Sequence, residues 1–175
     1  MRKAKKTALC GMLIALSVVL MAVTTVIPVA MYIMPILTGV IVILVLRSMS
    51  VKYALGVYIA TSVLCLVLIT DKEAALTYAL VFGYYPIIKS KLERLPKVAS
   101  WVVKFIIFNC GAVLIGVLSV YLFGVSGEEY SDLGRFTVPI LLSLANVVFL
   151  LYDISLKKND FIIKHISDKI AKKLK

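Results

Sequence analysis

The chain has 175 residues, of which 62% are hydrophobic and 17% charged, and its mean hydropathy is +1.03. Soluble domains contain about 45–50% apolar and about 25% charged residues, so this composition excludes an ordinary soluble domain, and it also excludes disorder, which needs low hydrophobicity. The 20 Lys and Arg residues outnumber the 9 Asp and Glu residues, and in a membrane protein such an excess reports orientation in the bilayer.

Six apolar segments have about the length, roughly 20 residues, that a helix needs to cross a membrane. Their apolar residues are continuous and lack the period-2 alternation of a barrel strand, which predicts helices. The segments are Thr7–Val26, Val29–Leu46, Val51–Ile69, Ala74–Lys89, Val98–Gly124 and Val138–Leu156. The expected fold is an all-α membrane protein, a six-transmembrane-helix bundle over residues 1–156, whose first helix is not removed as a signal peptide.

Proline and glycine lie inside two of these segments. Pro35 and Gly39 are expected to interrupt the second segment, and Gly83 and Pro86 to break the short fourth one. A broken helix in a membrane frees backbone carbonyl groups that need partners within the protein, and this is tolerated beside cavities.

Residues 157–175 form a basic tail with an apolar residue at every fourth position, namely Ile162, Ile166, Ile170 and Leu174. Lysines occupy the other face. The pattern predicts a C-terminal amphipathic helix that lies on anionic cytoplasmic lipid or on a cytoplasmic partner.

The basic residues are concentrated on one side of the predicted bundle. With six spans, 17 of the 20 Lys and Arg residues fall on the side that holds both termini, whereas Lys72 and Arg135 fall on the other side and Lys104 within the fifth span. Since segments rich in Lys and Arg stay in the cytoplasm, we expect a multi-pass protein of the cell membrane with both termini cytoplasmic. The lipid bilayer then explains the positive charge, and no nucleic-acid partner is expected.

The sequence lacks the usual motifs of catalysis, ATP binding and metal binding. It contains no GxxxxGK[ST], HExxH or GxSxG motif, and its only histidine, His165, lies in the tail. Cys10, Cys65 and Cys110 stand alone in apolar segments, where free cysteine packs as a small hydrophobe. We therefore expect no enzymatic activity, no cofactor and no metal site.

Two ionisable residues, Lys104 and Asp153, lie within the predicted spans near the inner side. Lys104 can extend its ammonium group to the interface, and Asp153 can pair with Lys104 or Lys157. Neither lies at the middle of the membrane, where a proton-coupled carrier usually has a carboxylate. Transport driven by a proton relay of its own is therefore disfavoured.

Polar and aromatic residues of the last three spans are candidates for ligand binding. Asn109 and Asn146 lie near mid-depth in adjacent antiparallel spans, so they either hydrogen-bond to each other or contact a ligand. Tyr78 and Tyr121 are either interface residues or part of a pocket. Glu128 belongs to a polar outer loop that is either a lid or a solvated hairpin. The candidate substrate-binding residues are Asn109, Asn146, Tyr78, Phe82, Tyr121, Thr77 and Glu128.

Small residues recur on one face of the first span, at Ala8, Gly11 and Ala15. Residues four apart share a helix face, so this strip allows another helix to approach closely. The approaching helix belongs either to this bundle or to a partner protein.

Taken together, these features resemble the substrate-binding S components of energy-coupling factor (ECF) transporters. The resemblance covers nearly the whole chain in length, span number, short first hairpin and broken second span. The segment from Leu9 through Gly11 to Ala15 is similar to the family's opening helix, whose small-residue strip docks on the coupling subunit, with Gly11 in place of the usual alanine. The resemblance implies a subunit that binds a vitamin or another small molecule under the outer loops, and that is energised by a separate transmembrane coupling subunit and two ABC-type ATPases.

The alternative function is a non-transporting membrane scaffold in cell-envelope assembly, of the type of the cell-shape protein MreD, which has a comparable size and span number. A scaffold predicts a packed interior and partners bound at the basic inner face. An importer subunit instead predicts a partly polar pocket that opens outward.

Overall fold

The computed structural model describes residues 2–27, 29–123 and 137–174, and these residues form helices without any β-strand. In chain order the elements are α1 (Arg2–Ala22), the 3-10 turn η1 (Val23–Thr25), α2 (Ala30–Ser48), α3 (Val51–Leu68), α4 (Lys72–Thr77), the π-helical turn η2 (Tyr78–Phe82), α5 (Tyr85–Leu92), α6 (Lys97–Phe123), α7 (Thr137–Lys158) and α8 (Asp160–Leu174).

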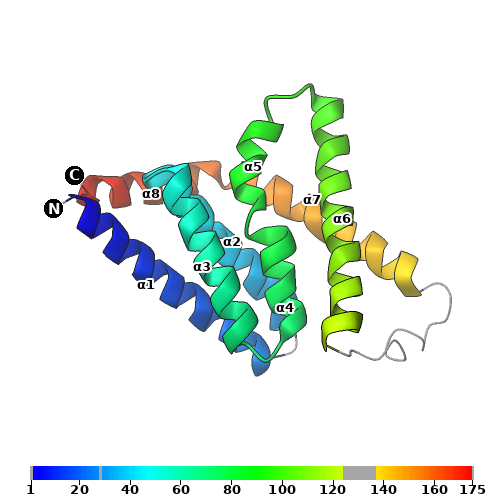
Figure 1. The fold of residues 1–175 in the computed structure, drawn as a ribbon. Helices are drawn as coiled ribbons and strands as arrows, with labels where there is room; N and C mark the ends of the chain where they lie inside the picture. The colour runs from blue at the N-terminus through cyan, green and yellow to red at the C-terminus, as the bar shows by residue number, and fades with distance from the viewer. Residues whose placement is uncertain (1, 28, 124–136, 175) are drawn as a thin grey trace.

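Five helices of the described part are long and apolar enough to cross a membrane: α1 continued by η1, α2, α3, α6 and α7. The prediction of an all-α protein with several membrane-length helices is thereby confirmed. The fourth predicted span differs from the others because it is divided into α4, η2 and α5. Figure 1 shows the start of α1 and the C-terminal helix α8 near each other.

Helix α2 lies at the centre of the bundle, in contact with α1, α3, α5, α8 and the turn η2. It runs without a break through Pro35 and Gly39, so the predicted interruption of the second span is wrong. Pro35 lies in the second turn of the helix, where its missing N–H removes a single intrahelical hydrogen bond. Gly39 serves close packing, since a Cβ there would lie 2.8 Å from the carbonyl oxygen of Phe82.

The segment from α4 to α5 is a broken helix, as predicted. The Asp71 carboxylate caps its start by accepting a hydrogen bond of 3.0 Å from the Ala74 amide. The helix then widens at η2, where the Gly83 amide donates to the Tyr78 carbonyl at 2.7 Å. It resumes as α5 with Pro86 in the first turn, where proline is well tolerated.

Side chains and backbones of neighbouring helices close around this break. The Tyr58 hydroxyl of α3 donates to the Ala79 carbonyl at 2.8 Å, so one carbonyl in the π turn has a partner from outside the segment. On the other side, Gly111 of α6 lies so close that a Cβ would be 2.8 Å from the Leu80 carbonyl oxygen. The break is therefore enclosed by α2, α3 and α6.

Helix α8 packs against α2 by one face. Ile163 and Ser167 are buried there, whereas Ile162 and Ile166 of the predicted apolar stripe remain 57% and 41% exposed. An ion pair between Arg47 of α2 and Asp160 holds the start of α8. The amphipathic C-terminal helix thus attaches to the bundle and still presents apolar side chains to its surroundings.

Candidate functional site

A buried ionic cluster joins α5, α6 and α7. The Asp153 carboxylate, 0% exposed, accepts hydrogen bonds from Lys89 Nζ at 2.6 Å, Lys104 Nζ at 3.0 Å and the Tyr85 hydroxyl at 2.5 Å. The predicted pairing of Asp153 with Lys104 is confirmed. Lys104 itself is 1% exposed, and its ammonium group is held on Asp153 inside the bundle.

Lys89 was not among the residues that the sequence singled out, although it ends the predicted fourth span. Its ammonium group also donates to the Asp153 backbone carbonyl at 2.9 Å. The two residues are 64 positions apart in the sequence, so no local spacing indicates their contact. The only available signal was the position of a lysine at the end of an apolar segment.

The Glu93 carboxylate lies beside this cluster. It is 3.8 Å from Lys89 Nζ, 3.8 Å from Lys104 Nζ and 3.7 Å from Lys157 Nζ. These distances are ion-pair distances and exceed those of good hydrogen bonds. Glu93 therefore neutralises three ammonium groups only weakly.

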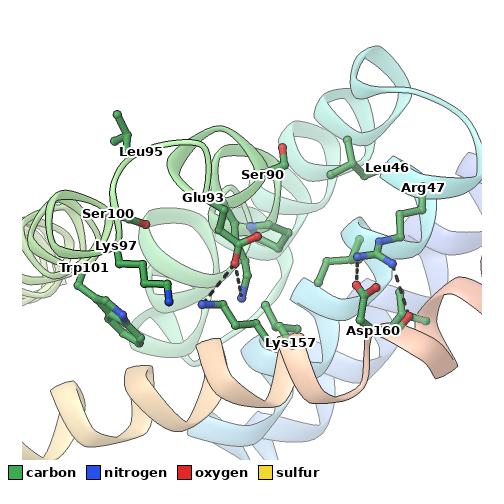
Figure 2. Close-up of a pocket in the computed structure, with 15 residues that line it drawn as sticks. Leu46, Arg47, Ser90, Glu93, Leu95, Lys97, Ser100, Trp101, Lys157 and Asp160 are labelled. Carbon is green, nitrogen blue, oxygen red and sulfur yellow. Dashed lines mark hydrogen bonds and ion pairs between the residues drawn. The ribbon is translucent and has the colours of Figure 1, made fainter.

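Next to the cluster is a cavity of about 750 Å³, shown in Figure 2, which we call the basic-end cavity. It lies where α2, α5 and α7 end and where α6 and α8 begin. Its lining residues are Ile43, Leu46, Arg47, Pro86, Lys89, Ser90, Glu93, Leu95, Lys97, Ser100, Trp101, Leu156, Lys157, Asp160 and Ile163.

The basic side chains that line the basic-end cavity differ in how fully acidic side chains neutralise them. Arg47 forms an ion pair with Asp160, and its guanidinium holds the pKa of the Asp160 carboxyl below its usual value. Lys157 lies at ion-pair distance from Glu93 and, at 3.6 Å, from Asp153. Lys97 has no ion pair within the described ranges. Positive charge is thus left over on the side of Lys97 and Lys157.

The structure places Asn109 and Asn146 against each other. Asn109 Nδ2 donates to Asn146 Oδ1 at 2.9 Å, and Asn146 Nδ2 donates to Asn109 Oδ1 at 3.0 Å. The second N–H of each amide donates to the carbonyl of the preceding turn, Phe105 or Leu142, at 2.8 Å. All four amide N–H groups therefore have partners, and a ligand at this position would accept hydrogen bonds only by replacing one of them.

The other candidate ligand residues are spread over the bundle. Tyr78 is fully buried, and its hydroxyl has no hydrogen-bond partner among the described residues. Phe82 is buried edge-on against Tyr152, with 5.0 Å between ring centroids. Thr77 is half-buried in α4, and Tyr121 is 83% exposed on α6. Glu128 lies outside the described residues, and none of the others lines the basic-end cavity.

The small-residue strip of α1 faces away from the bundle. Ala8, Gly11 and Ala15 are all exposed, and no atom lies within 4 Å of the position that a Cβ of Gly11 would take. The strip does not serve packing inside the described bundle.

Comparisons with known protein families, curated proteins and solved structures gave no match to this chain.

Proposed function

We propose that the chain is the membrane-embedded substrate-binding subunit of an ECF-type importer for a vitamin or another small molecule. In this proposal six segments cross the cell membrane, both termini are cytoplasmic, and a separate coupling subunit with two ABC-type ATPases supplies the energy. The main support is the strip of small residues on α1, which is exposed on the surface of the bundle and points away from the other helices.

An exposed glycine within a membrane helix leaves space for a second helix at its surface. In a helix interior, glycine is about 1 kcal/mol less favourable than alanine, and at Gly11 no neighbouring group of the described bundle uses the space. Close approach of a second helix would use it, because small residues allow two backbones to pack at short distance. The exposed apolar side chains of Met12, Leu16 and Val19 extend the surface around the strip.

The broken helix in the bundle supports the substrate-binding part of the proposal. Transporters commonly bind substrates at discontinuous helices, where polar backbone groups are available inside the protein. Here the break lies beside Tyr78, whose buried hydroxyl has no partner in the described ranges. Tyr78, Phe82 and Thr77 would contact the ligand from this segment, Asn109, Asn146 and Tyr121 from the last two spans, and Glu128 from the outer loop.

Native mass spectrometry of the complex purified in mild detergent from its own host tests the proposal. We expect a transmembrane coupling subunit and two ATPases to co-purify, together with a small molecule. Gly11→Leu should abolish this co-purification because its side chain fills the space for the partner helix. Gly116→Leu on α6 is the matched control, since Gly116 is also exposed and a Cβ there would have no atom within 4 Å. Equal recovery of partners by both variants would refute the docking role of α1.

One observation favours the scaffold function as a second candidate. The amides of Asn109 and Asn146 already hydrogen-bond to each other, as expected for an interior filled by its own side chains and not by a ligand. In the same experiment a scaffold would recover envelope-assembly proteins and no small molecule.

A further inference from the structure

The basic-end cavity carries more positive than negative charge. Its walls and the cluster beneath it hold five cationic side chains, Arg47, Lys89, Lys97, Lys104 and Lys157, and three acidic ones, Glu93, Asp153 and Asp160. This leaves a net charge of about +2 around the cavity, which favours the binding of an anion.

The available donors are arranged on one side of the cavity. Figure 2 shows the side chains of Lys97 and Lys157 reaching into it beside Trp101. Lys157 Nζ lies 5.4 Å from the centre of the Trp101 ring, on which it is held by a cation–π contact. Lys97 is exposed and has no partner within the described ranges, so both ammonium groups have hydrogen-bonding capacity left for a ligand.

The position of the cavity suits a membrane lipid. Three membrane-length helices have one terminus at the cavity: α2 ends at Ser48, α7 ends at Lys158 and α6 begins at Lys97. When these helices cross the bilayer, the cavity lies at the level of the lipid head groups. Its apolar walls, Leu46 and Leu95, fit the glycerol and upper acyl region of such a lipid.

We infer that the basic-end cavity binds a phosphate group, supplied by the head group of an anionic phospholipid. Lys97 and Lys157 bind the phosphate oxygens, and Trp101 forms the wall next to them. Basic cavities between membrane helices are suited to anionic head groups, and a volume of about 750 Å³ is within the usual range for a bound small molecule. This inference holds whether or not the chain is an importer subunit.

Trp101 provides a direct probe of the cavity, because it is the only tryptophan of the chain. The full chain, purified in an uncharged detergent, is titrated with water-soluble dihexanoyl phosphatidylglycerol while tryptophan fluorescence is recorded. We expect a saturable change. Dihexanoyl phosphatidylcholine should give a much weaker one because its choline group adds a positive charge next to the lysines.

Lys97→Gln tests the assignment without removing a polar contact of the bundle, since the Lys97 side chain makes no hydrogen bond or ion pair with the described residues. We expect the affinity for phosphatidylglycerol to fall roughly tenfold, as for the loss of one charge-assisted hydrogen bond. Lys91→Gln is the matched control, because Lys91 is an exposed lysine of the neighbouring α5 that does not line the cavity. Its affinity should be unchanged.

A further titration with glycerol phosphate distinguishes the two sources of the phosphate group. A weak response supports a lipid, whereas a Lys97-dependent response as strong as that to phosphatidylglycerol overturns the lipid in favour of a soluble phosphate compound. Equal responses to the two phospholipids, or equal affinities of Lys97→Gln and Lys91→Gln, would overturn the site itself.

Discussion

At the scale of single residues, Asp153 decides how α5, α6 and α7 fit together. Its carboxylate is the shared acceptor of Tyr85, Lys89 and Lys104. A charge in the membrane interior is tolerated when it faces the bundle and has a partner. Two ammonium groups therefore depend on one buried carboxylate, with Glu93 contributing only from a longer distance.

We expect Asp153→Asn to lower the free energy of unfolding by about 3–5 kcal/mol, because the variant leaves two buried ammonium groups without their counter-charge. Thermal unfolding in detergent, followed by circular dichroism, measures the change. Asp160→Asn is the control: its ion pair with Arg47 is exposed at the surface, so its loss should change stability by less than about 1 kcal/mol. Similar effects of both substitutions would show that the Asp153 cluster is not buried.

The asparagine pair makes a separate prediction. If Asn109 and Asn146 chiefly hold α6 and α7 together, Asn109→Ala and Asn146→Ala will each destabilise the protein, and the double variant will lose less than the sum. The expected coupling is about 0.6–2 kcal/mol, as for polar contacts between membrane helices. A double-mutant cycle of thermal unfolding gives this value, whereas additive effects together with a loss of bound ligand would assign the amides to substrate binding.

At the scale of elements, the broken segment between α4 and α5 shows what the sequence predicts and what it cannot. Gly83 and Pro86 indicate a break, because proline lacks an N–H and its ring does not fit within a continuing helix. The start of the π turn at Tyr78 has no comparable signal. It depends on close contacts with Gly39, Tyr58 and Gly111, which lie far away in the sequence.

Two glycines of α6 test these contacts in a matched way. A Cβ on Gly111 would lie 2.8 Å from the Leu80 carbonyl oxygen, whereas Gly116 has open space. We expect Gly111→Ala to destabilise the protein by about 1–3 kcal/mol, because α6 must move away from η2. Gly116→Ala should be neutral or stabilising by up to about 1 kcal/mol through helix propensity. Thermal unfolding of both variants is the measurement, and a neutral Gly111→Ala would contradict the close approach.

At the scale of the whole molecule, the membrane-length helices follow from apolar length, and the helical fold was therefore predictable. The arrangement of the candidate site was not. Asn109 and Asn146 meet because they lie on adjacent helices at similar depth, but Tyr121 lies exposed on α6 and Tyr78 is buried in η2. Depth along a helix can be estimated from sequence, whereas the direction of a side chain depends on how the helices rotate and tilt against one another.

The number of membrane crossings is the remaining question at this scale, and it depends on the broken segment. At about 1.5 Å per residue, the stretch from Lys72 to Leu92 is about 30 Å long, close to the thickness of the hydrocarbon core. We therefore predict that it crosses the membrane, with Thr70 outside and Lys91 in the cytoplasm.

Single cysteines at Lys52, Thr70 and Lys91, all exposed positions, test this prediction in a chain whose three native cysteines are replaced by alanine. In intact cells a membrane-impermeant maleimide should label Thr70→Cys, while Lys52→Cys and Lys91→Cys should react only after the membrane is opened. Labelling of Thr70→Cys and Lys91→Cys from the same side would mean that the broken segment does not cross. The basic residues after α5 would then lie on the side opposite to those after α2, and the charge asymmetry from which the orientation was predicted would be lost.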